Sequence, residues 1–217
     1  MATMLAYIAT DAVIDQPLLR HLLREAVARS FNRITVDGDT STNDACTLLA
    51  TGTSGVGLQS DSADLDQFAK ALNALCEALA KEIVADGEGA TRLLTVDIRS
   101  ALSEAEAERV AFTIAESPLV KTALFAADPN WGRILAAIGR SGINDLDVSK
   151  VRIAVGECPI AEAGALSPRY VEADAAKAMS ADAVTFNIEL GRGSAQAVVW
   201  TCDLSFDYVR INAEYRT

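Results

Sequence analysis

Apolar residues recur along the chain with the periods of both helices and strands. The clearest helical pattern runs from Asp64 to about Val84, where apolar side chains return every three or four positions and Asp64 can cap the first turn. A helix from about Gln16 to Ser30 is also expected, with Pro17 in its first turn. Three further helices are expected at 103–116, from Asp128 and Pro129 through Ile138, and at 172–179.

Short apolar runs between these helices predict strands. They cover an opening run within 1–11, expected to be a buried strand, and 45–52, 93–98 and 151–155. The runs 183–190 and 195–202 flank the turn residues 191–194 and predict a hairpin. A short extended piece at 34–36 leads into a polar loop, which reads DGDTSTND over 37–44. Composition leaves two interpretations of that loop equally open: a site loop, or a surface turn of side chains bonding their own backbone.

Composition indicates a globular protein. The chain has 217 residues, half of them apolar, enough for one large domain or two smaller ones, and the best composition break falls near 89–99. Thirty acidic residues against 19 basic ones give a net charge of -11, without a basic cluster, which argues against nucleic acid as a partner. Apolar windows are too short for a membrane span and no export signal is visible, so a cytoplasmic location is expected.

The four cysteines lie far apart in the sequence. Cys46, Cys76, Cys158 and Cys202 form no C-x-x-C pair, and a single histidine is present to join them in a metal site. We expect free thiols. That histidine, His21, lies within the helical pattern at 16–30 and is expected to be an ordinary helix residue. A Ser-His-Asp arrangement is therefore not favoured.

A hydroxyl follows a small residue where the first strand begins, at Ala2 and Thr3. If the bond between them is cut, Thr3 gains a free α-amine beside its own hydroxyl, which is a known form of activated nucleophile. An α-amine titrates near ~8, close to what a general base needs at neutral pH. The alternative is that Thr3 simply begins a strand, as β-branched residues often do.

Glu88 is unusual because it lies between two glycines just after a long helix. Gly87 or Gly89 can serve as the helix C-terminal cap. A carboxylate there is disfavoured by the negative end of the helix dipole, so a bound cation would explain it better. Trp131 is expected to be a packing anchor, the loop 52–57 a flexible connection, and the patterned segment 207–217 a terminus held in place.

Six ordered blocks of the sequence resemble the β-chain of the ornithine acetyltransferases of arginine biosynthesis. The blocks are MATML at 1–5 with TDA at 10–12, DGDTSTND at 37–44, DGEGA at 86–90, SPLVKTA at 117–123, DPNWGR at 128–133 and YVRINAEY at 208–215. The likeness spans the whole chain. It implies an α/β fold, a layered sandwich similar to N-terminal-nucleophile hydrolases, with a smaller C-terminal α+β domain.

The resemblance also implies how the protein is organised. Residues 1–92 would form the nucleophile-bearing domain, completed by an α-chain from the same precursor, and 93–217 would form the C-terminal domain, whose tail returns to the active site. Two α-chains and two β-chains would assemble into an α2β2 heterotetramer. No metal and no organic cofactor would be needed.

The reaction implied is a ping-pong acetyl transfer from N2-acetyl-L-ornithine to L-glutamate. Thr3 would be acetylated and ornithine released, and glutamate would then take the acetyl group. Some members of the family also use acetyl-CoA. Glu88, Asn212 and Thr217 match substrate-contacting positions, and Ala2 and Thr3 match the self-cleavage site. The oxyanion hole of the family lies on the α-chain, so this chain alone is expected to be inactive.

Two other functions stay open. One is an aminopeptidase or amidase that uses the same nucleophile and delivers the acyl group to water. Release of acetate without glutamate would favour it. The other is a non-catalytic amino-acid-binding subunit, in which Glu88 and the tail form a sensor pocket. A stable acetyl adduct on Thr3 would exclude that possibility.

Overall fold

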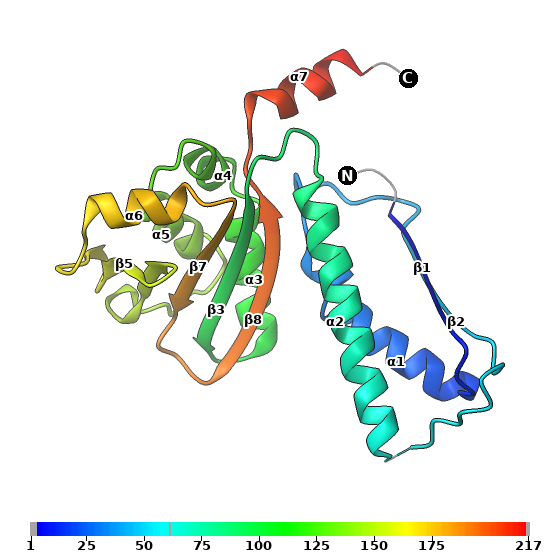
Figure 1. Cartoon of the computed structure of the whole chain (residues 1–217). Helices are drawn as coiled ribbons and strands as arrows, with labels where there is room; N and C mark the ends of the chain where they lie inside the picture. The colour runs from blue at the N-terminus through cyan, green and yellow to red at the C-terminus, as the bar shows by residue number, and fades with distance from the viewer. Residues whose placement is uncertain (1–3, 61, 216–217) are drawn as a thin grey trace. The chain divides into compact units, whose positions relative to one another are not determined.

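The structure is a computed structural model that describes residues 4–60 and 62–215. The chain divides into two compact units (Figure 1). Unit 1 comprises residues 1–34 and 39–82, and unit 2 comprises 35–38 and 83–217. The functional division expected at residues 92 and 93 stays a prediction. The expectation that the C-terminal domain is the smaller one also stays a prediction, because it compares 93–217 with a first domain that includes residues of a second chain.

Unit 1 is built on two parallel strands. β1 (Leu5–Thr10) pairs with β2 (Ala45–Ala50), and the connection between them contains α1 (Gln16–Ala28) and the 3-10 turn η1 (Phe31–Arg33). Parallel strands need such a crossover, since a tight hairpin can join only antiparallel ones. The long helix α2 (Ala63–Ala85) follows and leads into unit 2. These elements confirm the strands and both helices expected there.

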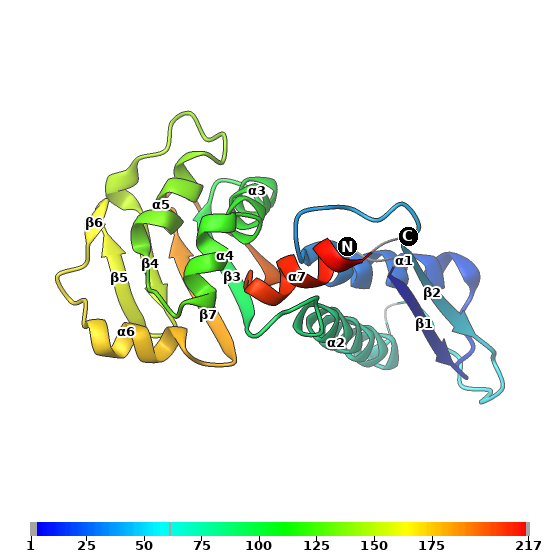
Figure 2. The same ribbon diagram turned by 90° about the horizontal axis from the view of Figure 1, so that it is seen from above.

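Unit 2 contains a six-stranded mixed sheet in the order β6-β5-β4-β7-β3-β8. The central strand β3 pairs with β7 in parallel and with β8 antiparallel. Figure 2 shows this sheet from above. The strands are β3 (Leu93–Ala101), β4 (Arg152–Val155), β5 (Cys158–Glu162), β6 (Ala165–Leu166), β7 (Ala183–Glu189) and β8 (Ala195–Cys202).

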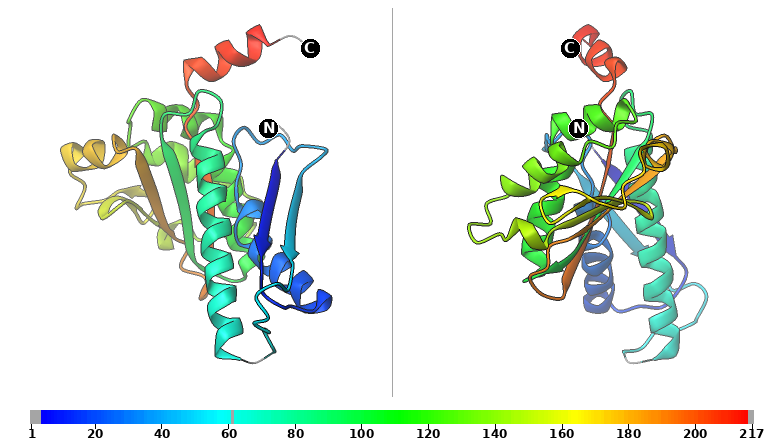
Figure 3. Two further views of the ribbon diagram at one scale, coloured as in Figure 1. Left: turned by 45° about the vertical axis from the view of Figure 1, so that its right-hand side comes forward. Right: turned by 90° about the vertical axis from the view of Figure 1, so that its left-hand side faces the viewer.

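Helices α3, α4 and α5 contact one another and lie on one face of that sheet (Figures 2 and 3). Alternate residues of the strands point into the core beneath them, as Leu94, Val96 and Ile98 of β3 do. Trp131 packs against this core and so has the anchoring role expected of it. The helices of unit 2 are α3 (Glu104–Ala115), α4 (Pro118–Phe125), α5 (Trp131–Gly139), α6 (Glu172–Met179) and α7 (Phe206–Glu214), with a 3-10 turn η2 (Val148–Lys150). Together the elements confirm the α/β fold class.

The hairpin expected between 183–190 and 195–202 is wrong. Both strands exist, but β3 lies between β7 and β8 and pairs with each. The connection wraps around the end of β3, where Arg192 and Gly193 donate their backbone amides to the Ser100 carbonyl at 2.7 and 2.9 Å. A Cβ on Gly193 would lie 2.4 Å from the Ala101 carbonyl oxygen, so this glycine permits a crossover rather than a tight turn.

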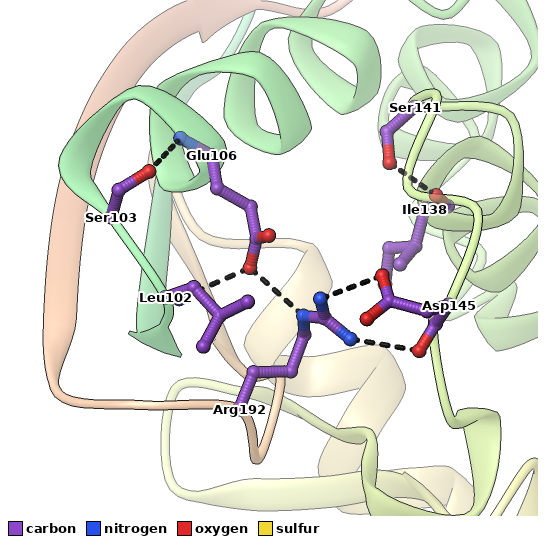
Figure 4. Close-up of polar contacts among 7 residues, drawn as sticks. All are labelled: Leu102, Ser103, Glu106, Ile138, Ser141, Asp145 and Arg192. Carbon is purple, nitrogen blue, oxygen red and sulfur yellow. Dashed lines mark hydrogen bonds and ion pairs between the residues drawn. The ribbon is translucent and has the colours of Figure 1, made fainter.

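A buried ion pair holds the crossover in place (Figure 4). Arg192 Nε donates to Glu106 Oε1 at 3.0 Å, and both side chains are only 9% exposed. The other guanidinium nitrogens donate to the backbone and side-chain oxygens of Asp145, each at 2.8 Å. Glu106 also accepts the Leu102 amide, so both ends of the pair are hydrogen-bonded. The many acceptors around Arg192 indicate a structural role.

One local expectation is confirmed in part and another needs correction. The piece at 34–36 is extended at Ile34, with φ -120° and ψ 150°, and the Thr35 amide donates to the Trp200 carbonyl at 3.0 Å, although these three described residues form no full strand. Helix α5 begins at Trp131 and is capped by Asn130, not by Asp128. The Asn130 side-chain amide nitrogen donates to the Asp128 carboxylate at 3.0 Å, and this hydrogen bond orients the capping side chain. Asp128 and Asn130 are both short polar residues that favour helix starts, so the sequence alone does not show which of them is the cap.

Candidate functional site

The structure brings together two of the residues expected to bind substrate. Glu88 lies in the loop after α2, and Asn212 lies on α7, both in unit 2. Ala2, Thr3 and Thr217 lie outside the described residues. His21 lies on α1 in unit 1, in keeping with an ordinary helix residue. The site described below is therefore built around Glu88 and Asn212.

Glu88 and Asn212 are joined directly. Asn212 Nδ2 donates to Glu88 Oε2 at 2.8 Å and to the Tyr208 carbonyl at 3.0 Å. Because an amide nitrogen has two hydrogens, these bonds use its donor capacity and leave Oδ1 as an acceptor. The pair therefore presents a carboxylate and an amide oxygen, both acceptors, from exposed side chains. Such a pair suits an ammonium group and disfavours a second carboxylate.

The loop that carries Glu88 approaches α7 very closely at Gly89. Gly89 has a φ of +67°, and a Cβ there would lie 2.5 Å from the Tyr208 nitrogen and 2.8 Å from Ser205 Oγ. Glycine is thus required for both its backbone angle and its lack of a side chain. Gly87 lies nearer the helix, with its amide 3.1 Å from the Val84 carbonyl. The close approach places Glu88 beside α7.

Helix α7 extends beyond the end of β8 (Figures 1 and 3) and begins with a capped turn. Ser205 Oγ accepts the Tyr208 amide at 3.3 Å and donates to the Gly89 carbonyl at 2.6 Å. The ring of Phe206 packs edge-on against Phe125 of α4, with centroids 5.6 Å apart. These contacts anchor the first turn of the helix, two turns before Asn212.

One end of the polar loop contacts α7. Tyr208 donates its hydroxyl to Asp37 Oδ2 at 3.1 Å, which ties α7 to the segment 35–38. The other end of the loop has a local structural role, since Asp44 Oδ1 accepts the Met4 amide at 2.9 Å in unit 1. Within the loop the Ser41 hydroxyl accepts the Asn43 amide at 3.2 Å, as expected for a turn whose side chains bond their own backbone, and a role of this loop in the site stays a prediction.

A buried lysine lies beneath the start of α7. Lys121 is 2% exposed, and its ammonium donates to Thr201 Oγ1 at 2.8 Å and to the Cys202 carbonyl. Burial lowers the pKa of Lys121, while Cys202, Asp203 and Asp37 act against that effect. Burial likewise raises the pKa of the Cys202 thiol. The lysine thus supports the chain just before α7 and does not face the Glu88–Asn212 pair through any described hydrogen bond.

Two concave regions elsewhere are not lined by Glu88 or Asn212. One, of about 490 Å³, lies on the sheet of unit 2 and contains Arg99, Arg152 and Arg169. Each of these arginines is paired with a carboxylate, at 2.6, 3.2 and 2.6 Å respectively. The other, of about 640 Å³, lies in unit 1 after β1. Among the described residues, no group of three or more His, Cys, Asp and Glu side chains could hold a metal ion.

Sequence reasoning missed several residues that shape the site. Asp203, Ser205 and Tyr208 all contact the loop around Glu88 or the polar loop, but only Tyr208 lies in the patterned terminus 207–217 that the sequence singled out. Asp203 follows a strand and looks like an ordinary loop residue. Its partners lie more than a hundred positions earlier in the chain, so no spacing rule could connect them. The described part of the chain contains no helix capable of crossing a membrane.

Comparison with known proteins gives consistent matches. The model of the ArgJ family matches residues 1–217. Proteins named "Arginine biosynthesis bifunctional protein ArgJ" from Pseudomonas fluorescens and Methylococcus capsulatus are 51% and 56% identical over 100% of this chain, and it covers 54% and 53% of them. The chain thus spans about half the length of these relatives. A crystal structure of the Bacillus halodurans protein of that name matches with a TM-score of 0.93 and 43% identity, over 98% of this chain and 100% of the other.

Proposed function

Because the chain belongs to the ArgJ family, we propose that it is the β-chain of an ornithine acetyltransferase of arginine biosynthesis. The longer relatives carry a name that places them in arginine biosynthesis, which supports this assignment. The acyltransferase activity, its substrates and its partners are those of the longer protein, of which this chain makes about half. A cytoplasmic location stays part of the proposal.

The observation that carries the proposal is the pairing of Glu88 with Asn212. Their acceptor oxygens favour an ammonium group, which ornithine and N2-acetyl-L-ornithine both carry on the side chain. The amide is held by the Tyr208 carbonyl, so its oxygen has a fixed direction. Ordered acceptors lower the entropy cost of binding a small cation. We assign Glu88 and Asn212 to the ornithine end of the substrate, with Thr217 as a third contact.

The chemistry proposed uses Thr3. After cleavage of the Ala2–Thr3 bond, the Thr3 amine would take the proton of its own hydroxyl as the oxygen attacks the acetyl carbonyl of N2-acetyl-L-ornithine. Ornithine leaves with a proton, and an acetyl ester remains on Thr3. The amine of L-glutamate then attacks that ester to give N-acetylglutamate and restore the hydroxyl. Acetyl-CoA would be a second donor, whose acetyl group passes to the Thr3 hydroxyl to form the same ester while coenzyme A leaves as the thiol. No cofactor takes part in either half.

An α-chain would complete the enzyme. The two-stranded parallel sheet of unit 1 is below the size at which sheets are stable alone. Leu5, Tyr7 and Leu49 on its strands are 57%, 70% and 54% exposed, which is unusual for large apolar side chains. We propose that the remaining half of the precursor packs on this sheet, supplies the oxyanion hole and assembles with this chain as α2β2. This chain alone would then be inactive.

Mass spectrometry of the enzyme made from the complete precursor tests the proposal. We expect a new N-terminus at Thr3 and, after exposure to N2-acetyl-L-ornithine, an acetyl adduct on that residue. The Thr3→Ala variant should form no adduct. Release of acetate without glutamate would support the amidase alternative. An intact Ala2–Thr3 bond in fully active enzyme, or the absence of any adduct, would overturn the mechanism.

A further inference from the structure

Asp203 is a buried carboxylate with three hydrogen bonds to the loop that carries Glu88. It lies directly after β8 and is 3% exposed. Its Oδ1 accepts the backbone amides of Thr91 and Arg92 at 2.7 and 2.9 Å, and its Oδ2 accepts the Thr91 hydroxyl at 2.6 Å. A buried carboxylate is retained only when its oxygens are well satisfied, and these three donors meet that need.

A second contact lies two residues further on. Ser205 Oγ donates to the Gly89 carbonyl at 2.6 Å. The segment 89–92 is therefore bonded to 203–205 at both of its ends. Glu88 immediately precedes this segment, and α7 with Asn212 immediately follows Ser205. The relative position of Glu88 and Asn212 is thus fixed through backbone that Asp203 and Ser205 hold together.

We propose that Asp203 is a positioning residue for the ornithine site, an inference that rests on the proposed function. Asp203 sets the position of the loop 88–92, and through it the distance from the Glu88 carboxylate to the Asn212 amide oxygen. It does not touch the substrate. When Asp203 is lost, the loop moves relative to α7, and the two acceptors no longer meet one ammonium group at once.

The alternative role is that of a counter-ion for the buried Lys121, because the Asp203 charge opposes the lowering of the Lys121 pKa by burial. The bond pattern separates the two roles. Asp203→Asn keeps an acceptor oxygen for both backbone amides, and its amide nitrogen can donate to the Thr91 hydroxyl. The geometry is retained while the charge is lost. Asp203→Ala removes the charge and the geometry together.

The test uses the complete processed enzyme with the variants Asp203→Ala and Asp203→Asn. Asp147→Ala is the matched control, because Asp147 accepts the amide and hydroxyl of one residue, Ser149, at 3.1 and 2.6 Å. For Asp203→Ala we expect KM for N2-acetyl-L-ornithine to rise about tenfold or more with a smaller change in kcat. Asp203→Asn should restore KM to within about threefold of wild type. The control should leave KM unchanged.

Hydrogen exchange of the peptide 86–92 is measured on the same variants without substrate. We expect faster exchange in Asp203→Ala and wild-type exchange in Asp203→Asn, because backbone amides of that peptide lose or keep their acceptor. Unchanged KM or unchanged exchange in Asp203→Ala would overturn the proposal. So would an Asp203→Asn variant as impaired as the alanine variant, because charge would then be the role.

Two further variants test the proposal even if Asp203→Ala does not fold. If Asp203→Ala does not fold, Thr91→Val and Ser205→Ala each remove one side-chain bond between the two segments and should each raise KM. Unchanged KM in both would refute the inference. Glu88→Gln tests the proposed function itself. If Glu88→Gln leaves KM unchanged, the site assignment fails, and exchange of the 86–92 peptide then decides the role of Asp203 alone.

Discussion

Replacing Gly89 by alanine should separate the loop 86–92 from α7. The added Cβ would lie 2.5 Å from the Tyr208 nitrogen and 2.9 Å from the Asp207 carbonyl carbon. Both are backbone atoms, so no side-chain rotation can relieve the contact. The helix and the loop must move apart, and the hydrogen bond between Asn212 and Glu88 at 2.8 Å should be lost with them.

The expected destabilisation has two parts. Alanine at a left-handed backbone angle costs about 1–2 kcal/mol, and forcing an extra methyl group into a packed site costs about 1–3 kcal/mol more. Gly142 provides a matched control, because its φ is +78° and nothing lies within 4 Å of the Cβ it would gain. Gly142→Ala should therefore show only the first part. At ~2–4 °C per kcal/mol, the control should lower Tm by about 2–8 °C, and Gly89→Ala by more.

Thermal unfolding and steady-state kinetics on both variants check this reasoning. Gly89→Ala should unfold at a lower temperature than Gly142→Ala and should have a raised KM for N2-acetyl-L-ornithine, whereas the control should keep the wild-type KM. Equal Tm values for the two variants would show that the close approach at Gly89 has no energetic weight. A raised KM in the control as well would show that the effect is not local to the loop.

Three further outcomes follow from other parts of the structure. Arg192→Met leaves the buried Glu106 carboxylate without its cationic partner and should lower the free energy of unfolding, measured in urea, by about 3–5 kcal/mol. Loss of the exposed ion pair of Arg152 should cost less than about 1 kcal/mol. Equal costs would contradict this reasoning. Burial raises the pKa of Glu116 above 4.5, so its stabilising contribution is complete below pH 4.5 and is lost as the pH rises through the raised value. Glu116→Gln should remove that slope from a stability–pH profile, and an unaltered slope would refute the assignment. Tyr7→Ser should leave the thermal stability of this chain nearly unchanged, because the side chain is 70% exposed, but should reduce co-purification with the α-chain; undiminished assembly would argue against that contact.

Local pattern predicted most elements of the fold and little of how they pair. The helix α2 was predicted because its apolar residues recur with helical period over many turns. The order of the strands was not predictable in this way. β8 pairs with β3, about a hundred positions away, and no local pattern in the sequence connects two strands so far apart.

The candidate site shows the same limit. Glu88 was noticed because a carboxylate between glycines after a helix is electrostatically unusual, but its partner Asn212 came from resemblance to a family and not from any spacing. Gly89 was expected to cap a helix, whereas its close contact with Tyr208 depends on a segment distant in the sequence. Asp203 gave no signal, because a carboxylate acting on remote backbone amides has no sequence pattern of its own.

The pairing of β3 with β8 also affects how unit 2 folds while the chain is being synthesised. β3 is an interior strand, yet one of its two neighbours follows every other strand of the sheet in chain order. During synthesis, one edge of β3 therefore stays open until β8 has emerged from the ribosome, and an open apolar strand edge invites aggregation. The segment with Asn212 emerges directly afterwards. A nascent chain thus gains a closed sheet and its ornithine-binding residues almost together, and a prematurely terminated one gains neither.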